Sequence, residues 1–121
     1  MTDNHDRTGA AVTVRLTPQG DAYAICLDGA DEPAGATYFI EVGDDRIFFH
    51  TTVGDEYAGR GLAGILVDHA LSDTRARGKT VVPVCPYVRA RVEKTAWDGP
   101  WRTPTAADLA VVGKHTEGGA E

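Results

Sequence analysis

Hydrophobic and polar residues alternate along the first half of the chain, which is the pattern of half-buried strands. Val12, Val14 and Leu16 are separated by polar residues, and a period of two places the apolar set on one face of a strand. The pattern predicts four strands, over residues 12–17, 23–27, 36–42 and 46–53. Turn-forming residues lie between them, including a hairpin signal at Gly43–Asp45. We therefore expect an antiparallel meander.

The period of the apolar residues changes at Leu62, where spacings of three and four replace the alternation. This stripe, with Gly78 as a C-terminal cap, predicts an amphipathic helix of roughly four turns. Three further elements are expected: a strand over residues 80–85, a helix over 86–94 that begins at a proline, and a short helix near 103–109. The fold class is therefore α+β, with a mixed, mostly antiparallel sheet of about five strands flanked by helices.

The length of 121 residues is sufficient for one hydrophobic core. We expect a single domain over residues 12–112, with flexible tails at 1–11 and 113–121, because both ends are polar or Gly-rich and lack a pattern. The sequence contains no charged-then-apolar leader and no apolar run long enough for a membrane helix. These features predict a cytoplasmic protein that does not insert in a membrane; they leave its oligomeric state open.

The net charge of −6 excludes the basic surface that a phosphate-tracking nucleic-acid binder needs. An acidic surface instead attracts cationic small molecules or basic peptides. Cys26 and Cys85 stand alone, with no Cys-x-x-Cys and no histidines at ligand spacing, so we expect neither a metal site nor a disulfide framework.

Three glycines lie at the start of the predicted first helix, where each costs about 1 kcal/mol relative to alanine. Gly59, Gly61 and Gly64 follow the strand that ends at Val53. Small residues there expose the first free N–H groups of the helix, and these form an anion site with the positive helix end. The Walker pattern is absent. The Gly-x-Gly-x-x-Gly spacing of dinucleotide sites is present, but it follows a meander instead of a βαβ unit.

Four stretches in order resemble a known family. Residues Glu56–Ala63 resemble the acyl-CoA pyrophosphate loop of the Gcn5-related N-acetyltransferases, and most closely that of their small single-domain branch. His50–Val53, Val81–Val88 and Ala34–Tyr38 are similar to further segments of that branch, and the resemblance covers about residues 12–94. Ala58 departs from the family pattern, which leaves the backbone of the loop, instead of that side chain, as the expected ligand.

The resemblance implies a cofactor cleft between the fourth and fifth strands, with acetyl-CoA as the acetyl donor. It implies an N-acetyltransferase that acts on an unidentified primary amine. The alternative is a CoA-binding or interaction module with little turnover, because so small a chain leaves little room for an acceptor pocket. The cofactor-binding residues that the resemblance implies are Thr52, Val53, Gly59, Arg60, Gly61, Leu62, Ala63, Gly64, Cys85 and Tyr87.

Two residues are candidates for catalysis. Cys85 is implied to lie near the thioester, where it is either a nucleophile with a lowered pKa or a small buried hydrophobe. His50 is either a base that takes the amine proton or a structural histidine. Covalent catalysis through Cys85 and direct attack by the amine both remain open.

Overall fold

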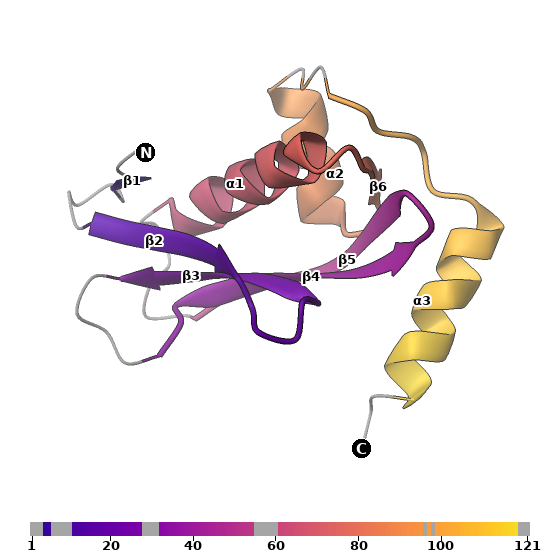
Figure 1. Cartoon of the computed structure of the whole chain (residues 1–121), viewed down its shortest axis with the longest axis horizontal. Helices are drawn as coiled ribbons and strands as arrows, with labels where there is room; N and C mark the ends of the chain where they lie inside the picture. The colour runs from indigo at the N-terminus through magenta and orange to yellow at the C-terminus, as the bar shows by residue number, and fades with distance from the viewer. Residues whose placement is uncertain are drawn as a thin grey trace.

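The computed structural model describes residues 4–5, 11–27, 32–54, 61–95, 97 and 99–118 (Figure 1). The strands are β1 (Asn4–His5), β2 (Ala11–Leu16), β3 (Ala22–Leu27), β4 (Gly35–Val42), β5 (Asp45–Val53) and β6 (Thr80–Pro83). The helices are α1 (Leu62–Ala76), α2 (Pro86–Lys94) and α3 (Ala106–Gly118).

The strands form one sheet in the order β1-β2-β3-β4-β5-β6. Neighbours are antiparallel from β1 to β5, whereas β5 and β6 are parallel. A parallel pair needs a crossover connection, which α1 provides. The predicted mixed, mostly antiparallel α+β fold is therefore confirmed.

Both ends of the chain carry more structure than the sequence pattern predicts. Asn4 and His5 pair with Val12 and Ala11, so a two-residue strand lies within the predicted N-terminal tail. At the other end α3 continues to Gly118, well beyond residue 112, where we expected the domain to end. The predicted fifth strand is shorter than expected, because the Val84 N–H turns back to the Val82 carbonyl (3.1 Å).

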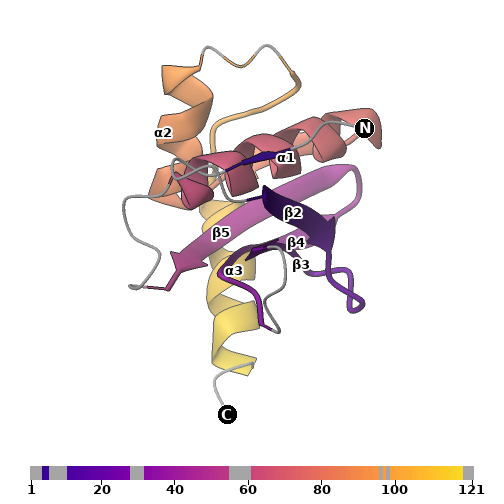
Figure 2. The same cartoon turned by 90° about the vertical axis from the view of Figure 1, so that its left-hand side faces the viewer.

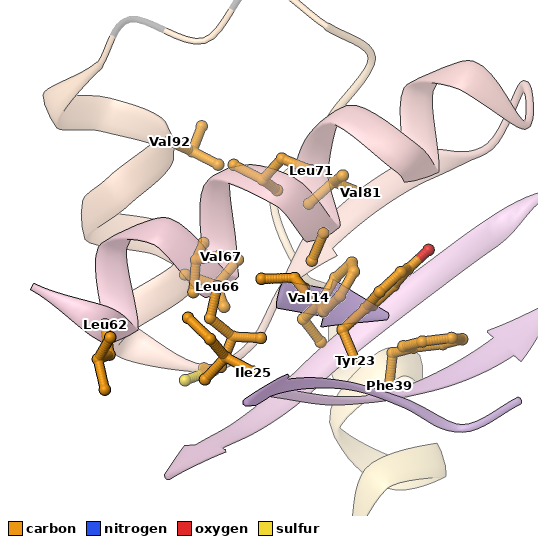
Figure 3. Packing of buried hydrophobic residues seen from close by; sticks show 14 of the residues in the cluster. Val14, Tyr23, Ile25, Phe39, Leu62, Leu66, Val67, Leu71, Val81 and Val92 are labelled. Carbon is orange, nitrogen blue, oxygen red and sulfur yellow. The ribbon is translucent and has the colours of Figure 1, made fainter. Parts of the chain in front are cut away.

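The hydrophobic core lies between the sheet and α1, which covers one face of it (Figures 1 and 2). Tyr23 and Ile25 of β3 point toward α1, and Leu62 and Leu66 of α1 point back toward the sheet (Figure 3). All four side chains are at most 1% exposed. On the other side of the sheet, α3 lies toward the β5 end and well away from α1.

Arg46 connects three strands and α1 through one buried guanidinium. Its Nε donates to Glu41 (2.7 Å), and its terminal nitrogen donates to the Tyr23 hydroxyl (2.6 Å) and to Thr74 Oγ1 (3.3 Å). The guanidinium carbon also lies 4.4 Å from the centre of the Phe39 ring. A buried charge is costly unless it is paired and hydrogen-bonded, and these partners meet that condition.

Tyr23 extends this hydrogen-bond network along α1, because its hydroxyl donates a hydrogen bond to the Asp73 carboxylate. Burial, followed by the hydrogen bond to Asp73, raises the pKa of Tyr23 to about 12. The phenol therefore stays protonated at neutral pH, and its hydroxyl remains a hydrogen-bond donor to Asp73.

The segment before α3 covers the outer edge of β6. Trp101 forms a parallel bridge with Val81, whose N–H donates to the Pro100 carbonyl (2.9 Å) and whose carbonyl accepts the Arg102 N–H (3.0 Å). Trp101 and Trp97 also pack against the core.

Arg102 and Asp108 fasten the start of α3 to the domain. The Arg102 guanidinium donates to both Asp108 oxygens (2.7 and 2.9 Å) and to Asp45 of β5 (2.9 Å). The Thr105 N–H donates to the same Asp108 carboxylate (2.7 Å), which caps the helix. The bonds from Arg102 are the main cause that holds the pKa of Asp108 well below its usual range, and they outweigh the opposing effect of burial.

We expect Asp108→Asn to destabilise the protein in a pH-dependent way. Because the pKa of Asp108 is lower in the folded state, its stabilisation is fully present above the unfolded pKa of about 3.9 and is lost as the pH falls toward the folded pKa. Urea unfolding at several pH values should therefore show a gap between wild type and variant that is constant from neutral pH to about pH 5 and narrows below about pH 4.

The matched control is Glu93→Gln, which removes one carboxylate from an exposed pair with Arg89 on α2. Such surface pairs contribute little, so its effect should be small at every pH. A gap for Asp108→Asn that stays constant down to pH 2 would contradict the proposed ion pair.

Candidate functional site

The candidate site lies where β5 extends beyond its parallel neighbour. The two strands pair from Asp45 and Thr80 to Phe48 and Pro83. The Cys85 N–H then donates to the Phe48 carbonyl (2.8 Å), and α2 begins at the next residue. β5 continues to Val53, and in the described part of the chain no strand pairs with its outer edge there. This opening between β5 and α2 is called the β5 gap below.

The backbone groups that point into the β5 gap follow from the ladder between β4 and β5. The Gly54 N–H donates to the Ala34 carbonyl (2.9 Å). Hydrogen-bonded and non-hydrogen-bonded pairs alternate in an antiparallel ladder. The backbone N–H and C=O groups of Thr52 therefore bond to β4, while those of Thr51 and Val53 point to the outer edge. Of the two residues predicted to bind along this edge, Val53 directs its backbone groups outward, whereas those of Thr52 face β4; the cofactor contacts of both stay predictions.

Gly35 keeps β4 and β5 close together beside the β5 gap. A Cβ atom at this position would lie 2.4 Å from the Thr52 carbonyl oxygen, which is closer than real Cβ contacts allow. The glycine in the Ala34–Tyr38 stretch is thus required by the approach of the neighbouring strand.

The first turn of α1 begins with amides that precede the intrahelical hydrogen bonds of the helix. Gly61 precedes the helix with φ 78°, a left-handed conformation that favours glycine. The first intrahelical bond runs from the Ile65 N–H to the Gly61 carbonyl (3.3 Å), so the amides of Leu62, Ala63 and Gly64 precede it. No acidic residue lies in this turn. Gly59 and Arg60, which we also predicted to bind the cofactor, lie outside the described residues.

Gly64 lies against a side chain that sequence analysis missed. Arg91 of α2 donates to both oxygens of Asp68 on α1 (2.8 and 2.7 Å). Its guanidinium would lie 3.3 Å from a Cβ atom at Gly64, so a glycine lets it rest on the first turn of α1. The ion pair of Arg91 with Asp68 therefore lies beside the helix start, with its guanidinium against the first turn of α1. No spacing in the sequence relates Arg91 to Gly64.

Cys85 and His50 are not brought together. The Cys85 thiol is 6% exposed within the core and donates to Thr51 Oγ1 (3.4 Å), which shares a second hydrogen bond with Thr37 (2.9 Å). His50 is exposed and stacks on Tyr38, with ring centres 5.8 Å apart. Since neighbouring side chains of a strand point to opposite faces, His50 lies on the face of β5 away from the Thr51 hydroxyl and Cys85.

Tyr87 lies in the first turn of α2, directly after the proline that starts the helix. Its side chain is 41% exposed, so it does not fill the core. The Cys85 backbone precedes the helix without a side-chain cap, and the first intrahelical bond is donated by Arg89 (3.0 Å). A second helix N-terminus, with its positive end, thus begins beside the hydrogen bond from Cys85 to Phe48 of β5.

Among the residues that the structure describes, no group of three or more His, Cys, Asp or Glu side chains is placed to hold a metal ion. None of the helices within the described ranges has the length and apolar character needed to span a membrane.

Comparison with known proteins gives one family match. A family model described as GCN5-related N-acetyl-transferase matches residues 22–98, which is more than half of the chain. The matched region includes the outer edge of β5, the start of α1 and α2 with Arg91. A search of curated proteins found no match.

Because Gly64 lies against Arg91, we expect Gly64→Ala to stabilise the protein less than a glycine-to-alanine substitution at a helix position where the new Cβ atom has open space. Alanine gains about 1 kcal/mol over glycine inside a helix, but here its Cβ must displace the guanidinium bound to Asp68. Gly113→Ala on α3 is the matched control, because a Cβ there meets nothing within 4 Å and should give the full gain.

A double-mutant cycle tests the cause. In the Arg91→Ala background, Gly64→Ala should recover a gain close to that of Gly113→Ala in urea unfolding. Equal gains for Gly64→Ala with and without Arg91 would show that the contact has no energetic effect.

Proposed function

Because the chain belongs to the GCN5-related N-acetyl-transferase family, we propose that it transfers an acetyl group from acetyl-CoA to a primary amine. The family implies acetyltransferase-type activity, and the donor and acceptor are the further step that we propose. The observation that carries it is the β5 gap, which has a free strand edge along β5 and helix N-termini near both ends.

The described residues suit the groups of acetyl-CoA. Its pantetheine arm carries amides, which match the N–H and C=O groups that Thr51 and Val53 direct into the β5 gap. Its phosphates match the amides of the first turn of α1, with the charge of Arg91 beside them. Gly59 and Arg60 remain predicted contacts of the same phosphates.

Acetyl-CoA supplies an activated acetyl group. The chain has to orient this group, stabilise the negative charge that develops on its carbonyl oxygen, and remove a proton from the attacking amine. The positive end of α2 lies beside the β5 gap and favours the negative charge that develops on the carbonyl oxygen. His50 is exposed on the other face of β5 and is available to accept a proton from an amine that approaches over that face.

The surroundings of Cys85 favour direct attack by the amine over a covalent acetyl-cysteine. The buried thiol donates a hydrogen bond to Thr51 Oγ1, and His50 lies on the opposite face of the strand. In direct attack the amine nitrogen forms the new C–N bond, the C–S bond breaks, and the thiol of CoA leaves with a proton.

Cys85→Ala should therefore retain most of the turnover, whereas loss of a covalent nucleophile costs several orders of magnitude. Release of free CoA from acetyl-CoA, with an amine mixture as acceptor, measures turnover, and thermal unfolding confirms that the variant is folded. Intact mass spectrometry of wild type after exposure to acetyl-CoA should show no added acetyl group. An adduct that disappears in Cys85→Ala, together with loss of turnover, would establish the covalent route instead.

Acetyl-CoA binding tests the proposal itself. Isothermal titration should show binding to the wild type, and Arg91→Met should weaken it by about tenfold, since a charge near the phosphates is lost. Arg89→Met on the same helix is the matched control; it removes an exposed charge that pairs with Glu93 and should leave the affinity unchanged.

No binding of acetyl-CoA at high concentration would refute the proposed function. Binding without CoA release, across a broad set of amines, would instead support a binding module that does not turn over.

A further inference from the structure

A pocket of about 510 Å³ lies on the sheet face opposite α1, outside the β5 gap. Its floor includes three alanines, Ala22, Ala24 and Ala36, and Asp21, Tyr38 and Thr52 are among the residues around it. This volume is within the range of small-molecule sites.

The alternation of β3 places the pocket. Tyr23 and Ile25 point into the core beneath α1, so Ala22 and Ala24 point to the opposite face. Ala36 pairs directly with Ala24 and therefore shares that face. The three short side chains leave the sheet hollow there, and α3 lies further along the same side, toward β5 (Figures 1 and 2).

The chemistry of the lining favours an organic ammonium group. Asp21 is the charged residue among those that line the pocket, and its carboxylate accepts a hydrogen bond from Thr17 (3.1 Å). Tyr38 adds an aromatic ring, and His50 stacks on it (5.8 Å). A carboxylate together with an aromatic face is the combination that recognises alkylammonium ions.

Arg15 of β2 also lies on this face of the sheet. Arg15 pairs with Ala24 in register and therefore points to the same side, but it is exposed and does not line the pocket. The charge that a ligand meets inside the pocket is thus that of Asp21.

The pocket also adjoins the β5 gap. Thr52 lines the pocket, while its neighbours Thr51 and Val53 direct their backbone groups into the gap. Ala22, Tyr38 and His50 stand in register across β3, β4 and β5. With strands about 4.8 Å apart, a ligand that reaches from Asp21, next to Ala22, to the gap beyond β5 must span roughly 10–15 Å.

We propose that this pocket binds the non-reacting ammonium end of the acceptor, and that the acceptor is a linear aliphatic polyamine. One amine stays protonated between Asp21 and Tyr38. The aliphatic chain crosses the alanine floor and Thr52, and a second amine, neutral when it reacts, reaches the β5 gap past His50. The assignment of the second amine as the acetylated group rests on the proposed function, whereas binding in the pocket does not.

Binding is tested with the full chain, without acetyl-CoA, by isothermal titration of diaminooctane, octylamine and diaminoethane. We expect diaminooctane and octylamine both to bind, because each has an ammonium group for Asp21 and an aliphatic chain that crosses the alanine floor. Diaminoethane is too short to cross the floor. Asp21→Asn and Tyr38→Leu should each weaken diaminooctane binding by about tenfold.

Asp44→Asn is the matched control, since Asp44 is an exposed acid in the turn between β4 and β5, away from the pocket lining. It should not change the affinity for diaminooctane. Equal binding of diaminooctane to wild type, Asp21→Asn and Tyr38→Leu would overturn the inference.

Turnover separates this inference from the proposed function. If both hold, Asp21→Asn raises KM for diaminooctane with little change in kcat, and it leaves KM for diaminoethane unchanged. Binding of diaminooctane that depends on Asp21, without CoA release, would refute the proposed function and keep the pocket assignment. CoA release with an unchanged KM for diaminooctane in Asp21→Asn and in Tyr38→Leu would refute the pocket assignment and keep the proposed function.

Discussion

The parallel pairing of β5 with β6 stops after Phe48 and Pro83, and the functional geometry depends on that early stop. Pro83 ends β6, a tight turn follows at Val84, and α2 begins at Pro86, so the chain leaves the sheet within three residues. β5 stays in place because β4 pairs with its other edge up to Val53. A sheet edge thus becomes available in the interior of the fold.

The rest of the structure keeps this opening rigid. Arg46 connects β5 with β3, β4 and α1 at the paired end of the strand. At the open end Leu62 is buried at the start of α1, and Arg91 joins that helix to α2 through Asp68. Burial of Leu62 and the ion pair between Arg91 and Asp68 therefore hold the start of α1 against the sheet and α2, which suits a site that must be preorganised.

Most of the fold follows from the sequence because its signals are local. Periods of two and of three to four residues identify the strands and place the start of α1 at Leu62. Long-range contacts are not encoded in this way. The packing of Arg91 on Gly64, the opposite faces of His50 and Cys85, and the extension of α3 beyond its Asp108 cap all depend on elements that meet only in the folded chain.

Trp101 gives the molecule a further property through its bridge to Val81. Exposed strand edges are templates on which other chains can assemble, and proteins that keep one open risk association. Here a short crossing segment occupies the outer edge of β6, and the opposite edge of the sheet ends in a strand of two residues, Asn4–His5. In the described part of the chain, β5 beyond Phe48 keeps an unpaired edge beside the start of α2, so the edge that stays open in the middle of the sheet is the one that the proposed ligand would fill.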